Sequence, residues 1–588
     1  MTDKAHARSP ISGIPTYDAP ITGLEKILHE QSYDWTLDLA AQIPTWLVTD
    51  DFDLEALNAS INASVYPPEL LPPIIDPTDI TQQTDALPPE RFEDIVRRHW
   101  FTHFEGPNTG QVTPDRLGSR YVDERYRQRL AEHLQYRVPT DPLPSTDFLN
   151  MCIQMYFARF NPIFPVVHAP TFRPSTQNSL LLLSICSIGS LFLGSRQGAS
   201  HGTKMFETLN KATLASWEKY MLKQKSEVRS MTQASLIGQI FAELLLVQTF
   251  HGTIITWARR NSMFRSRQAT DKIEPEMERD PEKAWLSWVA REEQNRLVAG
   301  LSILDSEFAE IFLTEPFMRR RSSMSLISDN ELWTATTAEE WCRLIRQQDS
   351  RMHRNSRPNR FKEYIELEQI AASIRDARTC DNWASASPPL RTALESHYSN
   401  FQSRTSNGPD ILCLKALWHA TFLTYLVDFD RLELVVGREG YLESQRELPF
   451  VRTWADSQDG HRCALHATLI LRSLESLPIG NVPAIHAPRV LYRATLVWYC
   501  YLQFSATDQG AVHPLDFPEL KHAGIDCERL LAEMNDFRPT RPKPLQSSIL
   551  CRCIDLLRHL GHWGLGRQLA VMWDSILYEL PQLPAGST

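Results

Sequence analysis

The feature that most limits what this chain can fold into is a stretch of 64 residues, Ile27 to Glu90, that contains no lysine and no arginine. It carries twelve acidic residues and eight prolines. Its formal charge is therefore −12, and the remaining 524 residues sum to about +2 against the chain's total of −10. A segment with this much like charge cannot bury enough apolar surface to offset the entropy of folding by itself. We expect it to be a disordered acidic segment.

Apolar side chains nevertheless stand between these acids. Asp50 or Asp51 is placed to cap a short helix, and acidic residues mixed with aromatic ones are typical of activation segments that fold in a groove on a partner. The residues predicted to anchor that helix are Trp46, Phe52, Leu54 and Leu57. The alternative is an acidic linker whose aromatic residues dock on the neighbouring domain, and the composition favours neither.

The rest of the chain has the composition of a folded protein, with 15 tryptophans in the whole sequence and 42% hydrophobic residues. The net charge of −10 argues against a protein whose main task is to neutralise phosphates, because nonspecific DNA affinity comes from lysine and arginine. Ten scattered cysteines predict reduced core thiols and an intracellular location, and no secretory signal is evident. The apolar run Leu180 to Leu193 is short for a bilayer and holds serines spaced three residues apart. We expect a buried helix that packs closely against another, and no membrane span.

Apolar residues recur with a helical period in most of the chain, and alternating strand patterns are nearly absent. The first helix of the core is expected to be capped by Ser145 or Thr146. Further helices are expected to begin near Leu180, Trp285 and Phe361, and over 204–222, 233–257, 410–434, 460–477, 487–503, 527–534 and 546–577. The pattern predicts an all-α fold, an irregular multi-helix array preceded by the disordered acidic segment. The expected organisation is a disordered N-terminus (1–26), the acidic, activation-like segment (27–90), a linker with short helices (91–144) and two helical parts (145–330 and 331–588).

Two stretches carry a family resemblance. The first is the run from Tyr156 to Phe172, YFARFNPIFPVVHAPTF, followed by LLLSICSIGS from Leu181. The second is the expected long helix, with Trp285-x-x-Trp288, Glu292 and Arg296, which continues through LDSEF to Glu315-Pro316. Together they resemble the fungal-specific transcription factor regulatory domain, the middle homology region of zinc-cluster and C2H2-finger activators. Residues 145–330 would be its first part and 331–588 its C-terminal helical part. On the long helix, Glu292 and Arg296 are spaced to pair, worth a few tenths of a kcal/mol if exposed.

The family's zinc DNA-binding module has no counterpart in this sequence. A zinc finger needs two cysteines and two histidines at fixed spacing, and a zinc cluster needs six close cysteines, whereas the first cysteine here is Cys152. Two explanations remain open: a start missing from the sequence, or a member that acts through a DNA-binding partner. Direct DNA contact is therefore left open.

No other motif assigns a chemical site. Cys551, Cys553, His559 and His562 lie close in sequence, but on one helix Cys551 and His559 are about 12 Å apart, so we expect no metal site. The glycine-rich and nucleophile motifs of common enzymes are absent, and we assign no catalytic, cofactor-binding or metal-binding residue. An enzyme with an unrecognised site is the less favoured alternative. A candidate nuclear import loop is formed by Arg351, Arg354, Arg357, Arg360 and Lys362.

These observations predict a nuclear transcription regulator that acts as an activator. The family resemblance implies that it controls a metabolic or secondary-metabolite gene set. Its expected partners are the transcription machinery or a coactivator, together with a DNA-binding partner or a second copy of the chain. No cofactor is expected. The alternative is a helical interaction protein or corepressor that does not bind DNA and modulates a protein that does.

Overall fold

The computed structural model describes residues 91–100, 144–174, 178–195, 197–207, 209, 225–241, 244–264, 273–318, 327–351, 359–379, 383–404, 410–478, 482–505, 517–530, 548–560 and 564–579. All of them belong to one of the two compact units into which the chain divides. The acidic segment, the N-terminus before it and the anchors Trp46, Phe52, Leu54 and Leu57 lie outside these residues.

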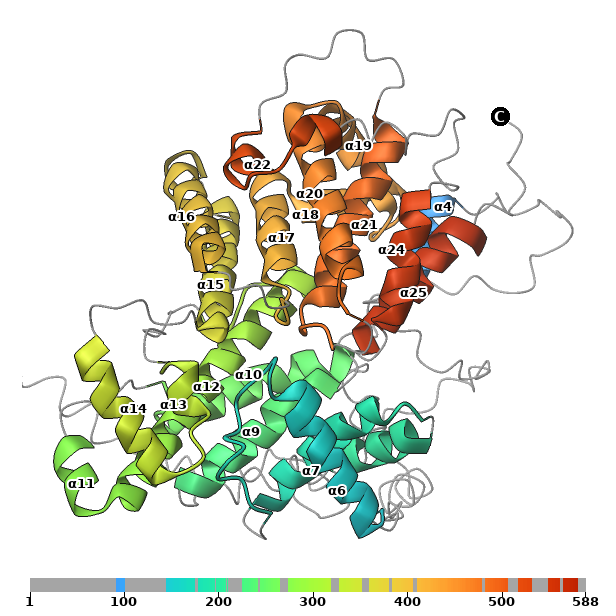
Figure 1. Cartoon of the computed structure of the whole chain (residues 1–588). Helices are drawn as coiled ribbons and strands as arrows, with labels where there is room; N and C mark the ends of the chain where they lie inside the picture. The colour runs from blue at the N-terminus through green and yellow to red at the C-terminus, as the bar shows by residue number, and fades with distance from the viewer. Residues whose placement is uncertain are drawn as a thin grey trace, which may run out of the picture. The chain divides into compact units, whose positions relative to one another are not determined.

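Helices form all of the regular secondary structure in this described part, which confirms the all-α prediction (Figure 1). In chain order they are α4 (Phe92–His99), α6 (Thr146–Met155), the π-turn Tyr156–Phe160, α7 (Ser179–Ser190), the 3-10 turn Leu191–Leu193, α9 (Lys225–Phe241), α10 (Leu244–Arg260), α11 (Ile273–Arg279), α12 (Pro281–Phe312), α13 (Asn330–Trp333), α14 (Ala338–Arg351), α15 (Arg360–Thr379), α16 (Trp383–Arg404), α17 (Leu414–Leu426), α18 (Phe429–Val436), α19 (Tyr441–Ala455), α20 (Gln458–Glu475), α21 (Ala487–Phe504), α22 (Pro518–His522), α24 (Ser548–His559), α25 (Gly564–Asp574) and the π-turn Ser575–Glu579.

The apolar run predicted as a buried helix is α7, which packs closely on α6. The hydroxyls of Ser184, Ser187 and Ser190 donate to carbonyls of their own helix, so these buried serines need no outside partner. A Cβ on Gly189 would lie 2.0 Å from the carbonyl oxygen of Cys152 on α6. Only glycine therefore allows the two backbones to approach this far.

The first stretch that carries the family resemblance packs on α12, the helix that contains most of the second stretch. His168 lies between the rings of Trp285 and Trp333, at centroid distances of 5.9 and 4.7 Å. Its backbone N–H donates to the Glu293 carboxylate of α12 at 3.1 Å. The Gln233 side chain on α9 donates to the carbonyl of Val166 at 2.8 Å. The polar backbone of the extended run is thereby satisfied inside the core.

The Glu292–Arg296 pair predicted on α12 is formed, and it is buried. Arg296 Nε lies 2.8 Å from Glu292 Oε1 as the spacing predicts, but the two side chains are only 0% and 2% exposed. Glu292 also accepts from the Ser328 N–H and hydroxyl, and the Arg296 guanidinium lies 4.2 Å from the ring centroid of Trp333. The pair is therefore a buried structural element, because α12 is covered on more than one side.

Several helix boundaries also differ from the expected ones. The stretch 410–434 forms two helices, since Val427 is extended and the Asp428 carboxylate accepts from the Asp430 N–H at 3.0 Å, which caps α18. The stretches 233–257 and 546–577 are likewise divided, between α9 and α10 and between α24 and α25.

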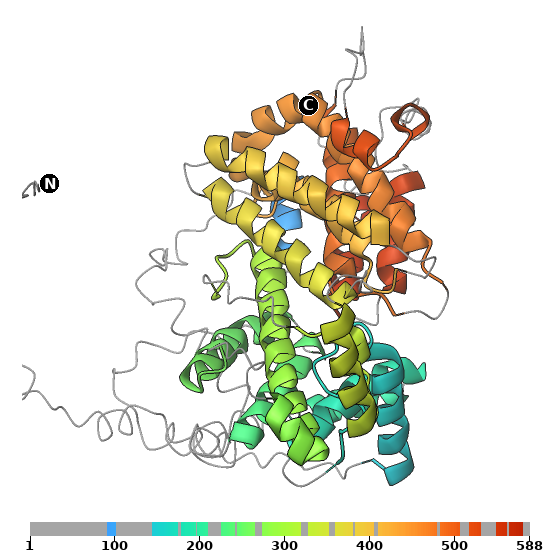
Figure 2. The same cartoon turned by 60° about the vertical axis from the view of Figure 1, so that its left-hand side comes forward.

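Helices α14, α16 and α19 are not predicted from the periodicity. Helix α16 contains Pro388 and Pro389, and α19 contains Pro449. Proline removes a backbone donor and usually ends a helix, so these residues obscure the pattern. Figures 1 and 2 show α16 alongside α15, which it contacts over much of its length.

The short helix α4, expected within the linker, packs on α19 more than 340 residues later in the chain. Val96 and Trp100 are each 1% exposed within the main apolar core. Asp94 Oδ1 accepts from the Tyr441 N–H at 3.0 Å, and the Arg91 guanidinium lies 3.7 Å from the Tyr441 ring centroid. Asp94 thus caps α19, whose own N-cap residue is a glycine.

No helix in the described ranges combines the length and the apolar character needed to cross a bilayer.

Candidate functional site

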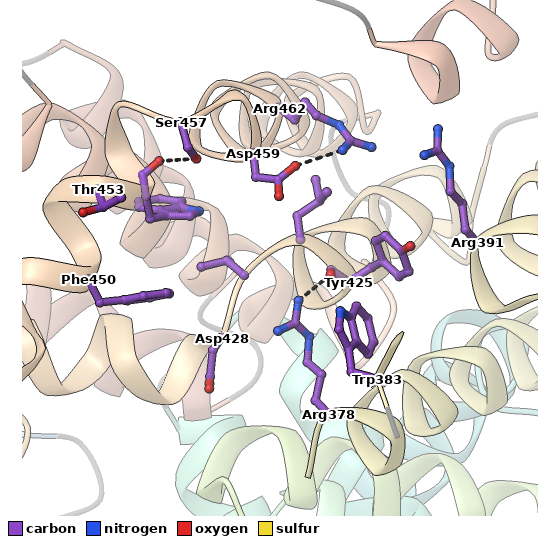
Figure 3. Close-up of a pocket in the computed structure, with 13 residues that line it drawn as sticks. Arg378, Trp383, Arg391, Tyr425, Asp428, Phe450, Thr453, Ser457, Asp459 and Arg462 are labelled. Carbon is purple, nitrogen blue, oxygen red and sulfur yellow. Dashed lines mark hydrogen bonds and ion pairs between the residues drawn. The ribbon is translucent and has the colours of Figure 1, made fainter. Parts of the chain in front are cut away.

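A pocket of about 490 Å³ lies among the helices from α15 to α20 (Figure 3). This volume is within the range of small-molecule sites in proteins. Its walls come from the end of α15, the exposed face of α16, the turn between α17 and α18, the second half of α19 and the first turns of α20. The polar lining residues include Arg378, Arg391, Asp428, Asp459 and Arg462, and the aromatic ones include Trp383, Tyr425, Phe450 and Trp454.

Arg378 is the cation with the fewest protein partners in this lining. Its guanidinium donates to the carbonyl oxygen of Tyr425 and lies 4.5 Å from the ring centroid of Trp383. Its Nε is buried and has no hydrogen-bond partner. Among the residues with described side chains, no carboxylate is within 4.0 Å of it. Burial lowers the pKa of Arg378, and the charges of Asp428 and Asp459 oppose that shift.

Arg462 and Arg391, in contrast, are held by carboxylates. Arg462 Nε lies 2.8 Å from Glu519 Oε1, and its Nη1 lies 2.9 Å from Asp459 Oδ1. Arg391 Nε lies 2.8 Å from Glu395 and its Nη2 lies 3.6 Å from Glu519. Both guanidiniums are therefore largely neutralised from behind the pocket wall.

Glu519 anchors a buried polar chain behind this wall. Burial alone would raise the pKa of Glu519, but hydrogen bonds from His466 and Arg462 lower it to about 2. His466 Nε2 lies 3.6 Å from the Glu519 carboxylate, and the two Nδ1 atoms of His466 and His419 are 2.9 Å apart. Burial lowers the pKa of both histidines. The carboxylate stays charged and the His419 ring stays neutral at physiological pH, which fixes the position of Arg462.

Two helix N-termini contribute to the lining. Asp428 caps α18, and the Ser457 hydroxyl caps α20 by accepting from the Gly460 N–H at 3.1 Å. Helix N-termini carry partial positive charge. Opposite them, Trp383 and Tyr425 pack with ring centroids 5.1 Å apart. The pocket therefore combines aromatic walls with the guanidinium of Arg378, which has no carboxylate within 4.0 Å among the described side chains.

A second polar feature lies deeper, between α12, α15 and α21. It contains three carboxylates and three guanidiniums: Glu307, Glu310, Glu368, Arg375, Arg489 and Arg493. We call it the buried ion network.

In the buried ion network, each guanidinium lies close to at least one carboxylate. Arg489 binds Glu307 through Nε and Nη2, at 2.7 and 2.6 Å. Arg375 Nη1 lies 3.0 Å from Glu310 Oε1, and Arg493 contacts the same carboxylate. Burial would raise the pKa of Glu310, but the three guanidiniums around it lower that pKa. The charges balance locally, as buried charges must.

None of the sequence-predicted residues that the structure describes is in the pocket lining or in the buried ion network. Of the candidate import loop, Arg351 is the last residue of α14, while Arg360 and Lys362 lie in the first turn of α15. Arg354 and Arg357 are outside the described residues. Cys551 and His559 both lie on α24, where His559 Nδ1 bonds with the Asp555 carbonyl at 2.6 Å. Within the part of the chain that the structure describes, no three potential ligands converge as a metal site requires.

Comparison with known proteins finds a family match for part of the chain. A family model described as the fungal specific transcription factor domain matches residues 153–400. Over these residues the chain is similar to that family. The matched residues extend from α6 to α16, and so include both stretches of the predicted resemblance. They also supply Arg378, Trp383 and Arg391 to the pocket, whereas its other walls follow the matched region.

Three curated proteins are similar to part of the chain, and two of them are named as transcription factors. The chain is 26% identical over 211 residues to zinc finger protein klf1 of Schizosaccharomyces pombe. It is 27% identical over 209 residues to a transcription factor of Gibberella fujikuroi, and 25% identical over 210 residues to the nicotinate catabolism cluster-specific transcription factor of Emericella nidulans. Each match covers 34% of this chain and 24–26% of the relative, so the chain spans about a quarter of their length. No solved structure matches the chain.

Proposed function

We propose that this protein is a nuclear regulator of transcription, in which the helical unit serves as a regulatory and interaction platform. The observation that carries the proposal is the domain match over residues 153–400, together with two relatives that are named as transcription factors and one that is named as a zinc finger protein. An import function for the loop from Arg351 to Lys362 belongs to the same proposal.

The acidic segment, residues 27–90, is the reason for proposing an activator. Its charge of −12 and its interspersed aromatic residues support an activator that recruits the transcription machinery or a coactivator. Trp46, Phe52, Leu54 and Leu57 would bury their side chains in the partner. The neighbouring carboxylates would keep the helix soluble and steer it to basic surfaces.

Fusion of residues 30–65 to an unrelated DNA-binding domain tests this role. We expect reporter transcription from the fusion and its loss when the four anchors are replaced by alanine, because each anchor supplies apolar area at the partner interface. A matched control replaces the four polar residues Asn58, Ser60, Asn62 and Ser64 by alanine and should keep the output. Unchanged output in the anchor variant would remove the activation claim.

The regulated genes are proposed to form a metabolic or biosynthetic set. The name of the Emericella nidulans relative states such a role for that protein. Transcript profiling of a strain that lacks this gene should show coordinate changes in one such set. Changes confined to unrelated housekeeping genes would contradict the proposal.

A helical corepressor or interaction protein is the second candidate. In this candidate, contact with DNA would come through a DNA-binding partner. Chromatin occupancy that disappears when a co-purifying DNA-binding protein is removed would favour this candidate. Occupancy that persists would favour an activator with its own contact to DNA.

A further inference from the structure

The pocket between α15 and α20 has the chemistry of a ligand site, and we propose that it binds a small organic acid, a carboxylate on a flat aromatic or apolar body. The carboxylate would bind Arg378, and the body would lie against the aromatic wall around Trp383. This inference goes beyond the proposed regulatory function and does not depend on it.

The charge balance of the lining supports an anionic ligand with one charge. Arg391 and Arg462 are each paired with a carboxylate, whereas no carboxylate with a described side chain lies within 4.0 Å of Arg378. Asp459 is already engaged by Arg462, and Asp428 caps α18. The uncompensated cation is Arg378, whose hydrogen bond to the Tyr425 carbonyl leaves most of its donors unused. A ligand carboxylate would supply the charge-assisted hydrogen bonds that the protein does not.

The orientation of Arg378 fits this role. Figure 3 shows its guanidinium reaching into the lining beside Trp383, while the Asp428 carboxylate points away from the centre of the group. Stacking on Trp383 restrains the guanidinium before any ligand arrives. A cation held in advance loses less entropy on binding than a mobile one.

The remaining walls define the body of the ligand. Trp383 and Tyr425 form one aromatic pair, and Leu426, Val427 and Phe450 add apolar surface from the α17–α18 turn and from α19. A flat ring in contact with these side chains would exclude water from the pocket. The lower local dielectric would strengthen the ion pair between the ligand carboxylate and Arg378. A polyphosphate fits less well, because it carries several negative charges and Arg378 is the single guanidinium of the lining that is not paired with a carboxylate.

Direct binding to the purified full-length chain tests the proposal. With 2-naphthoate as the probe, titration calorimetry should give a Kd of roughly 0.1–1 mM, as expected for a ligand of this size at ordinary efficiency. The neutral isostere 2-naphthamide should bind about tenfold more weakly or not at all, because it lacks the charge. Sulfate at the same concentration should not displace the acid, because it has no apolar body.

Variants locate the site. Arg378→Met should weaken 2-naphthoate binding about tenfold or more. The matched control is Arg446→Met on α19, whose side chain is 71% exposed and outside the pocket; it should leave the Kd unchanged. Thr453→Trp, at an exposed position on the rim, should block the pocket without removing a charge. Thermal melts of each variant establish that the fold is kept.

Three results would overturn the proposal. These are no detectable binding of 2-naphthoate to the parent chain, equal binding of the acid and the amide, or unchanged binding in both Arg378→Met and Thr453→Trp. Displacement by sulfate would show a simple anion site and remove the claim about the aromatic body. If Arg378→Met unfolds, the Thr453→Trp result decides.

Discussion

At the scale of single residues, buried titratable groups in this unit differ in how they are compensated. Glu310 is surrounded by three guanidiniums and keeps its charge. Glu368, in the same buried ion network, has a raised pKa because burial and the nearby Glu307 carboxylate both disfavour its ionised form. His486 is fully buried against Tyr364, with ring centroids 5.0 Å apart. Each of these groups makes stability depend on pH in its own direction.

His486 gives a testable pH dependence. Burial lowers the pKa of His486 to about 4, with Glu307 opposing and Arg489 assisting the shift. The unfolded chain, with a histidine pKa near 6.5, binds this proton more readily. Stability is therefore lost as the pH falls from about 6.5 towards 4. His486→Phe should remove about 2 kcal/mol of the difference in unfolding free energy between pH 7.5 and pH 5.

Urea unfolding at the two pH values measures this effect. The control His99→Gln, at an exposed position on α4, should retain the parent's pH dependence, since its side chain is solvated in both states. A His486→Phe variant that loses as much stability as the parent between the two pH values would contradict the assignment.

The sequence predicts which residues are spaced to contact each other on a helix, but it does not predict whether the pair is buried. The i,i+4 spacing of Glu292 and Arg296 correctly indicates their contact. Whether the pair is exposed was left open by the sequence, and the structure shows that Ser328 and Trp333 cover it from a segment about 35 residues later. The spacing of two residues on one helix does not indicate whether a distant segment of the chain buries them.

At the scale of elements, α4 is a long-range cap. It supplies Asp94 to the start of α19 and buries Val96 and Trp100 in the core. Composition alone places this stretch in a linker with short helices, since it is short and strongly charged. Its contacts with α19 show that residues 91–100 are part of the packed unit.

Truncation tests the contribution of α4. Removal of residues 1–100 should lower the stability of the rest of the chain by several kcal/mol, since a fully buried large apolar side chain contributes roughly 1.5–3 kcal/mol. Removal of residues 1–90 alone is the matched control and should change the melting temperature little. Equal melting temperatures for the two truncations would show that α4 does not stabilise the unit.

The helical elements themselves were largely predictable where one apolar stripe runs without interruption, as in α12, α20 and α21. The prediction fails at prolines and at turns. Pro388, Pro389 and Pro449 lie inside helices although each lacks a backbone donor, so a proline does not reliably mark a helix end. The break at Val427 is set by the Asp428 cap, which a continuous apolar period does not reveal.

At the scale of the whole described unit, the buried ion network links the matched family domain to the helices that follow it. Glu307 and Glu310 lie on α12, and their partners Arg489 and Arg493 lie on α21, outside residues 153–400. Removal of one member leaves a buried charge without compensation. Such a change usually costs about 3–5 kcal/mol.

Arg489→Met should therefore destabilise the chain by about 3–5 kcal/mol. The matched control is Arg552→Met, because Arg552 binds Glu475 in the same two-pronged way, at 3.0 and 2.6 Å, but is 42% exposed. That variant should lose no more than about 1 kcal/mol. Chemical denaturation of both variants measures the difference, and equal losses would show that burial of the network has no special weight.

The pocket was not predictable at this scale. Its residues come from five segments between Arg378 and Arg462, with no shared motif, and only the packing of α15 to α20 brings them together. The family resemblance, in contrast, is carried by continuous runs such as Tyr156–Phe172. Continuous signals can be recognised in a single sequence, whereas a site assembled from separate helices requires the fold.

The position of the carboxylates on α12 has a consequence for how such genes can be rearranged. A recombination event that transferred only the segment encoding residues 153–400 to another host gene would carry Glu307, Glu310 and Glu368 with Arg375 but without the arginines of α21. The hybrid would hold three buried carboxylates with only one of their three guanidiniums. Viable breakpoints should therefore fall beyond α21, so that inheritance treats the two halves as one cassette.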